Sequence, residues 1–272
     1  MSHQNIKILS IEASGAAASV ALYDASMTKA AMPAMITRAD RHGHAAWITE
    51  MVDDLMQQEK TDFHAITHIA AGAGPGSFTG IRVGLAAAQG YGIALAKPVL
   101  GIPSLDALGF SVFQTVNADL PASQNKQVLA LIDTRRGHYF GQCFDVNTAF
   151  DQHSGDQTTK DTVLDMDADM LVEHMIRHHT ATACDALYIK GFEATDIAGT
   201  LTAAGVPVKG YDDGDVDAGM IAQFAYAAIN SGKSVTDYPP TPRYHSAPIL
   251  GPAKASPAKA SPAKASSAKA GR

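Results

Sequence analysis

The sequence predicts an α/β protein with two lobes. Its 272 residues, 46% of them apolar, are enough for two small lobes that each have a core. Two blocks of the chain each open with a pair of strand-like runs joined by a short turn, and each continues with helical and strand patterns. Such alternation is typical of α/β folds, in which helices cover a sheet.

The first block opens with strands at Ile6–Ile11 and Ser19–Tyr23, which small residues join as a hairpin. Lys29–Ile36 is expected as a third strand, at a sheet edge because Pro33 cannot donate a ladder hydrogen bond. The apolar spacing of residues 45–56 predicts an amphipathic helix. The block then continues with a strand at Ile66–Ala71, a helix at Thr79–Ala96 ended by Pro98, a strand at Val99–Ile102 and a helix after Ser104.

The second block opens with a strand at Val128–Asp133, a turn at 134–137 and a returning strand at His138–Phe144. Residues 147–162 are polar and are expected to form a loop. The remaining elements are predicted as a helix at Met170–Met175, a strand at Leu187–Gly191, and helices at Ile197–Ala204 and Met220–Ile229. We expect one lobe at 1–102, a smaller lobe at 103–246 and a tail at 247–272.

The tail repeats a Pro-Ala-Lys-Ala-Ser unit, has no large apolar side chain within the repeat and is expected to be disordered. It carries five cations and no acid, so the 16 remaining Lys and Arg face 27 acids, a net charge of −11. An acidic body does not favour nucleic-acid binding by the chain alone. We see no signal peptide and no membrane span, and Cys143 and Cys184 are expected to be buried thiols of a cytoplasmic protein.

The stretch 72-GAGPGSFTG-80 has two interpretations. Glycines before a helix expose backbone N–H groups that can hold a phosphate. However, no Lys follows the last glycine and Phe78 stands where a small residue is usual, so the match to a Walker loop is weak. The alternative is a tight turn that lets a helix approach a neighbouring segment closely.

The helix after this turn carries a stripe of small residues at Gly80, Gly84, Ala88 and Gly92. Each helical glycine costs about 1 kcal/mol relative to alanine, so a close approach must compensate. The stripe packs either on the protein's own sheet or against the helix of a partner. In the second interpretation, Trp47 and Met51 of the preceding helix would help to form the same surface.

Several motifs together resemble the TsaB family, whose members assist the TsaD enzyme in making threonylcarbamoyladenosine on tRNA. They are ILSIEASGAAASVAL, the helix that follows GPGSFTG, PVLGIPSLDAL, ALIDTRRGHYF and the late PRY of Pro242–Tyr244, in that order. The resemblance implies a two-lobed actin/Hsp70-type fold, each lobe a mixed sheet flanked by helices. It also implies a subunit without catalytic residues of its own.

The implied partners are a TsaD-like protein, a TsaE-like ATPase and a second copy of the chain, with tRNA contacted only through the complex and no membrane contact. No cofactor is expected on the chain alone, and ATP or ADP is expected only in the complex. The resemblance places the partner interface on the two helices described above. The expected interface residues are His44, Trp47, Met51, Gly80, Gly84, Ala88, Tyr91 and Gly92.

The sequence gives little indication of a metal site or of a nucleotide site. No His occurs in 103-PSLDALG-109, where the related TsaD enzyme has metal ligands, so no metal site is expected. Proteins of the actin type hold phosphates at their two hairpins, where Glu12 and His138 depart from the residues usual in the family, which disfavours independent ATP hydrolysis. The weak candidates for nucleotide or anion contacts are Glu12, Ser14, Gly74, Gly76, Ser77, Thr79, Arg82, Asp133 and Arg135.

Two alternatives remain open. The hairpins and the glycine turn would also suit a small-molecule kinase of the same fold, which would bind Mg-ATP tightly by itself. A metallopeptidase ranks last, since neither His64–His68 nor His174–His178 has the Glu that a zinc-protease helix places after its first His.

Overall fold

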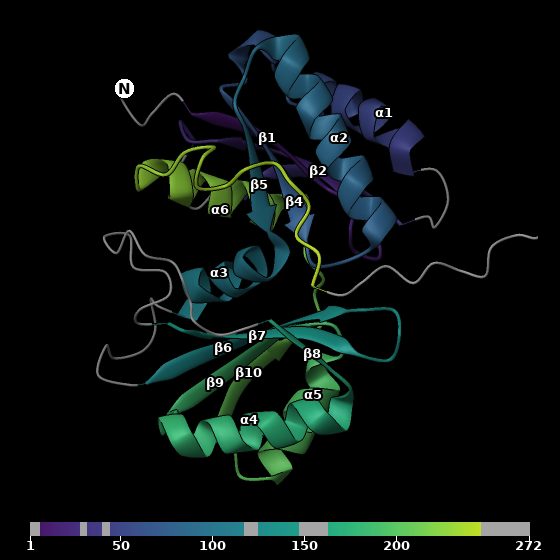
Figure 1. Ribbon diagram of the computed structural model, residues 1–272. Coiled ribbons are helices and arrows are strands. Elements are labelled where there is room, and N and C mark those ends of the chain that lie inside the picture. The colour runs from purple at the N-terminus through teal and green to yellow at the C-terminus, as the bar shows by residue number, and fades with distance from the viewer. Residues whose placement is uncertain (1–5, 28–31, 40–43, 117–124, 147–162, 246–272) are drawn as a thin grey trace, which may run out of the picture.

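A computed structural model describes residues 6–27, 32–39, 44–116, 125–146 and 163–245. Within these ranges the chain forms two five-stranded sheets (Figure 1). Along the long axis of the molecule the layers are α1 and α2, the first sheet, α6 and α3, the second sheet, and α4 with α5. The predicted loop at 147–162 and the tail at 247–272 lie outside the described residues.

The first sheet has the strand order β3-β2-β1-β4-β5. Its central strand β1 pairs antiparallel with β2 and parallel with β4, so the sheet is mixed. β3 lies at the edge, as predicted, but it begins at Ala34, after the Pro33 that was expected within it, and residues 29–31 of the predicted strand lie outside the described residues. The strands are β1 (Lys7–Glu12), β2 (Ala18–Asp24), β3 (Ala34–Arg38), β4 (His68–Gly74) and β5 (Val99–Pro103), and the helices on the outer face are α1 (His44–Gln58) and α2 (Phe78–Leu95).

The second sheet has the strand order β10-β9-β6-β7-β8 and is also mixed. α4 (Ala168–Thr182) and α5 (Ala194–Ala203) cover its outer face, and α3 (Ser104–Val116) lies on the side of the first lobe (Figure 1). The strands are β6 (Lys126–Asp133), β7 (Tyr139–Asp145), β8 (Leu164–Met166), β9 (Ala186–Gly191) and β10 (Val208–Asp212).

The last helix, α6 (Ala218–Asn230), returns to the first sheet. Ser10 of β1 donates its hydroxyl hydrogen to the carbonyl oxygen of Ala218 at 2.6 Å, and Ser19 of β2 accepts from the backbone N–H of Ala218 at 2.9 Å. Both serines are buried, so these bonds satisfy polar groups that water cannot reach. The helix thereby covers the inner face of a sheet formed some 200 residues earlier in the chain.

Three apolar clusters follow from the layers. Alternating residues of β1 separate two of them: Ile8 faces the cluster shared with α3, α6 and the second sheet, and Leu9 faces the cluster under α1 and α2. The third cluster lies between the second sheet and the pair α4 and α5. Cys143 and Cys184 are buried free thiols, as predicted.

Most predicted elements are present, with ends displaced by a few residues, although α4 continues to Thr182 where the predicted helix ended at Met175. The exceptions are β8, β10 and a short 3₁₀ turn at Phe63–Ala65, which the sequence patterns did not indicate. None of the described helices combines the length and the apolar character that a membrane crossing requires. The boundaries of the three predicted parts stay a prediction, and α6 shows that the chain returns to the first lobe after building the second.

Candidate functional site

The glycine turn, residues 72–80, connects β4 to α2 by a path that requires glycine. Gly74 and Gly76 have φ of +98° and +153°, a region that other residues rarely adopt. Ser77 then caps α2, because its side chain accepts a hydrogen bond from the N–H of Gly80 at 3.3 Å. The helix begins at Phe78, one residue before the predicted start.

The first hairpin fills this turn. The N–H of Ser77 donates to the carbonyl oxygen of Ser14 at 2.9 Å. A Cβ added at Gly80 would lie 2.0 Å from the carbonyl oxygen of Ala13, and one added at Gly76 would lie 2.6 Å from Oγ of Ser14. A phosphate-binding turn needs N–H groups that are open to the ligand. The geometry therefore favours the close-packing interpretation of the turn.

The small-residue stripe of α2 packs inside its own lobe. Gly80, Gly84, Ala88 and Gly92 are all buried. A Cβ at Gly84 would lie 3.7 Å from Cβ of Ala13, and one at Gly92 would lie 2.3 Å from Cγ2 of Val99 in β5. The interpretation of this stripe as an exposed surface for a partner is therefore wrong, because the first hairpin and β5 already occupy it.

The expected contribution of α1 needs a similar correction. Met51 is fully buried in the cluster under α1 and α2, so its side chain does not project from the lobe. Trp47 and Tyr91 are partly buried against the same cluster, and Tyr91 stacks on Phe63 with 6.1 Å between ring centroids. The side chain of His44 lies outside the described residues.

The opposite face of α2 is the exposed one. A Cβ at Gly90 would meet nothing within 4 Å, and Ile93 has 84% of its surface exposed. A second series of small residues, Ala86, Gly90 and Ala94, lies on this face at the same four-residue spacing as the buried stripe. We call this the outer face of α2, and its exposed residues are Arg82, Ala86, Gln89, Gly90, Ile93 and Ala94.

Glu12 ends β1 as a buried carboxyl over the glycine turn. Its Oε1 accepts from the N–H of Ser14 at 2.5 Å, and its Oε2 has no hydrogen-bond partner in the described chain. A Cβ at Gly72 would lie 1.7 Å from this Oε2, so the glycine makes room for the carboxyl. Burial raises the pKa of Glu12 to about 7, and the charge of Asp215 acts in the same direction.

The second hairpin reaches across to the first. Asp133 accepts from the N–H of Arg135 at 2.6 Å, which supports the left-handed backbone of Arg135. Nη2 of Arg135 donates to the carbonyl oxygen of Gly15 at 2.5 Å. Of the predicted anion contacts, the structure thus groups Glu12, Ser14, Gly76, Ser77 and Arg135 around the two hairpins, whereas Thr79 is exposed on α2.

A C-terminal arm, Tyr238–His245, borders the same region. It crosses β5 and β4 in Figure 1, where the N–H of Gly101 donates to the carbonyl oxygen of Tyr238 and the N–H of Arg243 donates to that of Ala73. Nε of Arg82 donates to the hydroxyl of Tyr244 at 2.8 Å. The guanidinium of Arg82 also lies 3.8 Å from the ring centroid of Phe78. Arg82, which was predicted to contact an anion, therefore binds the C-terminal arm through Tyr244.

Between the glycine turn, the second hairpin and the arm lies a pocket of about 210 Å³. Residue patterns did not identify Arg136, Phe140, Arg243 or His245 as part of it, although the PRY motif contains one of the four. These residues meet only in the fold, since more than 100 positions separate the hairpin from the arm.

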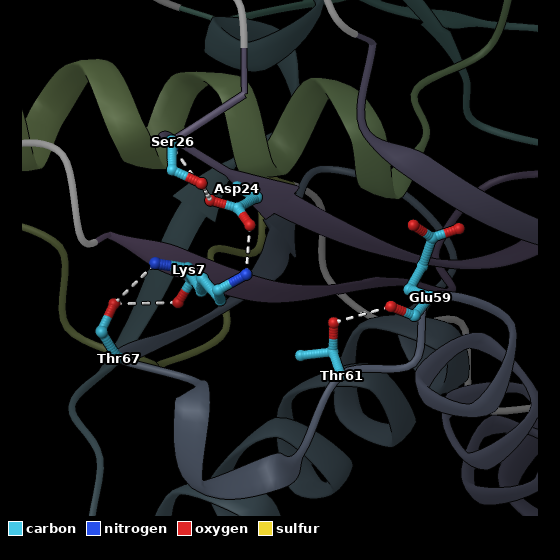
Figure 2. Close-up of polar contacts among 6 residues, drawn as sticks. All are labelled: Lys7, Asp24, Ser26, Glu59, Thr61 and Thr67. Carbon is cyan, nitrogen blue, oxygen red and sulfur yellow. Dashed lines mark hydrogen bonds and ion pairs between the residues drawn. The ribbon is translucent and has the colours of Figure 1, made fainter.

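Two other pockets lie away from the hairpins. One of about 430 Å³ lies among α3, α6, β9 and β10. The other, of about 330 Å³, lies at the start of β1, where Figure 2 shows Lys7 paired with Asp24 and Thr67 bonded to the backbone of Lys7. Although burial acts to raise the pKa of Asp24, hydrogen bonds from Lys7 and Ser26 lower it. The polar groups of this end are thus paired with one another.

Within the described ranges, no three His, Cys, Asp or Glu side chains come together in a way that could hold a metal ion. The rings of His174 and His178 stack on α4 with 6.2 Å between centroids.

Sequence comparison matches residues 36–199 to the family model described as TsaD, tRNA N6-adenosine threonylcarbamoyltransferase. The chain is 33% identical over 141 residues to the tRNA threonylcarbamoyladenosine biosynthesis protein TsaB of Haemophilus influenzae, covering 51% of this chain and 54% of the relative. It is 31% identical over 135 residues to the protein of the same name from Escherichia coli, covering 50% and 53%. The chain thus spans about half of the length of the curated relatives that it matches.

Solved structures agree on the fold. A Pseudomonas aeruginosa protein described as similar to the peptidase YEAZ superposes with a TM-score of 0.60 at 23% identity, over 88% of this chain and 99% of the other. The ROK hexokinase of Thermus thermophilus superposes with a TM-score of 0.50 at 10% identity, over 83% and 99%. With the two mixed sheets, these likenesses confirm the expected two-lobed fold of the actin type.

Proposed function

The chain belongs to the TsaD family, and from this premise we propose that it is a non-catalytic subunit required for N6-threonylcarbamoylation of adenosine in tRNA. It is a homologue of the TsaB proteins of this biosynthesis. In the proposed role it pairs with a TsaD-like protein and activates it, and the partner carries out the chemistry.

The observation that carries this proposal is the closed glycine turn. In an actin-type fold the two hairpins would hold the phosphates of a nucleotide, but here the carbonyl oxygen of Ser14 accepts a hydrogen bond from the N–H of Ser77, which closes the first hairpin onto the glycine turn. The buried carboxyl of Glu12 adds a group with a pKa of about 7 that disfavours a nearby phosphate once it is ionised. These features support a chain that binds no cofactor alone, with ATP or ADP bound only in the complex with TsaD and a TsaE-like ATPase.

The outer face of α2 is the pairing surface that fits this role. Ala86, Gly90 and Ala94 leave the helix backbone accessible, so a partner's helix can approach closely, and Ile93 offers an exposed apolar side chain at its edge. We assign to this face the pairing with TsaD, and the self-association of the chain when the partner is absent.

Gly90→Leu tests the pairing, because the new side chain points away from the lobe and leaves the fold intact. We expect it to weaken the complex with TsaD about tenfold or more through the clash that it introduces. Gly199→Leu is the matched control, since Gly199 lies on α5 of the other lobe and also has nothing within 4 Å of its Cβ position. Size-exclusion chromatography of each variant mixed with TsaD gives the measurement.

Equal co-elution of the two variants would remove α2 from the interface. If the unmodified chain neither co-elutes with TsaD nor supports tRNA modification in a reconstituted reaction, the proposed function itself fails. Tight binding of Mg-ATP by the isolated chain in calorimetry would favour the kinase instead. In the proposed role the protein works in the cytoplasm and reaches tRNA only through the complex.

A further inference from the structure

One peptide group of the first hairpin, between Gly15 and Ala16, is bound from two sides by charged side chains. Nη2 of Arg135 donates to the carbonyl oxygen of Gly15 at 2.5 Å, and Oδ2 of Asp215 accepts from the N–H of Ala16 at 2.9 Å. This peptide bond is trans, so its C=O and N–H point in opposite directions and the two side chains approach it from opposite sides. Hydrogen bonds that involve a charged group are stronger than those between neutral partners.

Arg135 belongs to a turn of fixed shape in the second lobe. Its left-handed backbone, with φ of +58°, is supported by Asp133, whose Oδ1 accepts from the N–H of Arg135 at 2.6 Å. Oγ1 of Thr134 accepts from the N–H of Arg136 at 3.2 Å and donates to the carbonyl oxygen of His138 at 2.9 Å. Because these bonds hold the turn, its movement relative to the first hairpin requires a movement of the second lobe.

Asp215 lies where the chain returns from the second lobe to the first, between β10 and α6 (Figure 1). The connection is anchored on both sides of it. Asp213 accepts from the N–H of Thr195 in α5 at 2.8 Å, and Asp217 accepts from the N–H of Met220 in α6 at 2.8 Å. The position of the Asp215 carboxylate is therefore set by an element of each lobe.

The first hairpin fits closely between these groups. A Cβ added at Gly15 would lie 2.6 Å from Oδ2 of Asp215, so a side chain at this position would displace the carboxylate. In its own lobe, the carbonyl oxygen of Ser14 accepts from the N–H of Ser77, the residue that caps α2. A rotation of one lobe against the other would therefore break a bond to the hairpin or move the start of α2.

We propose that Arg135 and Asp215 form a latch that holds the two lobes in one fixed orientation through the peptide group between Gly15 and Ala16. Lobes joined by such connections can otherwise rotate about them as rigid bodies. Because both side chains bind the same peptide group, the loss of one bond lets the group move and weakens the other. The latch is a property of the chain alone, needs no bound ligand and does not rest on the pairing with TsaD.

Hydrogen exchange at the N–H of Ala16, measured by NMR on the full chain, tests the latch. Arg135→Met removes the donor to the carbonyl oxygen of Gly15 and leaves the acceptor of this N–H, Asp215, unchanged. We expect the N–H of Ala16 to exchange about tenfold or more faster in the variant, because the peptide group is then free to turn away from the carboxylate.

Arg136→Met is the matched control. It makes the same change of charge on the same turn, and among the described residues the side chain of Arg136 has no hydrogen-bond or ion-pair partner. We expect it to leave the exchange of Ala16 unchanged. Equal exchange in Arg135→Met and the unmodified chain, or an increase in Arg136→Met as large as in Arg135→Met, would overturn the proposal.

Single-molecule fluorescence energy transfer measures the orientation of the lobes. Dyes are attached at Gly90→Cys on α2 and Gly199→Cys on α5, two positions where a Cβ meets nothing within 4 Å, and the native thiols are buried. We expect one narrow distribution of transfer efficiency with the latch intact. Arg135→Met and Asp215→Ala should each broaden it or add a second population.

The two variants open the latch from opposite sides, so if one does not fold by circular dichroism, the other still decides. A distribution that stays narrow in a folded variant would overturn the proposal, because the orientation would then be held by other contacts. Unfolding of both variants would overturn it too, since the two bonds would then maintain the fold and not only the orientation of the lobes.

Discussion

Two alanine substitutions one turn apart in α2 test how the buried stripe is packed. At Gly84 a Cβ would lie 3.7 Å from Cβ of Ala13 and 3.8 Å from Cγ2 of Ile11, which are ordinary contact distances. At Gly80 it would lie 2.0 Å from the carbonyl oxygen of Ala13, and a backbone atom cannot yield as a side chain can. The same chemical change thus makes ordinary van der Waals contacts at one site and a clash at the other.

We expect opposite signs of the change in stability. Gly84→Ala should raise the free energy of unfolding by up to about 1 kcal/mol, the helix propensity that alanine adds. Gly80→Ala should lower it by about 3 kcal/mol or more, because the hairpin must shift to relieve the overlap. The two variants should therefore differ by roughly 4 kcal/mol, or on the order of 10 °C in Tm.

Urea denaturation followed by far-UV circular dichroism measures this difference. Equal stability of the two variants, or a loss at Gly84→Ala as large as at Gly80→Ala, would refute the packing described for the first hairpin. Gly84→Leu extends the test, because its added carbons have no room between Ala13 and Ile11 and should unfold the chain. A folded Gly84→Leu protein that has only lost its partner would instead restore the interpretation of an exposed stripe.

Three further outcomes are expected. The pKa of Glu12 is raised from 4.5 to about 7, so the folded protein keeps this proton longer than the unfolded chain, and stability should fall as pH rises through that window by up to about 3 kcal/mol. Glu12→Gln should remove this fall, which urea denaturation at about pH 5 and about pH 8 measures. If the free energy of unfolding of the variant changes with pH as it does in the unmodified protein, Glu12 is not a buried neutral carboxyl. The pKa of Asp24 is lowered, so its contribution to stability is present at neutral pH and is lost in acid. Asp24→Asn should therefore lower the free energy of unfolding by about 1 kcal/mol at neutral pH and leave it unchanged in acid, where the carboxyl of the unmodified chain is protonated. A difference between the two proteins that stays constant with pH in thermal melts would exclude the pair with Lys7 (Figure 2). Asp217→Ala should destabilise the protein by about 1 kcal/mol, since this side chain caps α6 by accepting from the N–H of Met220 at 2.8 Å, and a Tm equal to that of the unmodified protein would count against the cap.

Most helices and strands could be predicted from the sequence because the patterns that indicate them lie within single elements. Apolar periodicity located α1 and α2, and proline placed β3 at an edge, since each signal depends on residues within one element. β8 and β10 were missed because Leu164–Met166 and Val208–Asp212 are too short for an alternating pattern to stand out from their surroundings.

The site was less predictable because it depends on which segments meet. A stripe of small residues indicates a close approach, but only the position of the first hairpin decides that Ala13 and not a partner makes it. The pocket between the second hairpin and the C-terminal arm joins residues that neither periodicity nor spacing relates. Burial of Glu12, which determines its pKa, likewise appears only when the sheet is assembled.

The return of α6 to the first sheet has a consequence for the order in which the protein is made. The ribosome releases β1 long before it synthesises Ala218, the residue that Ser10 and Ser19 bind. Until then, the nascent first lobe keeps an apolar face uncovered and available to chaperones or to other unfinished chains. A chain that ends before α6 lacks the helix that covers this face, and we expect it to aggregate more readily than the full chain.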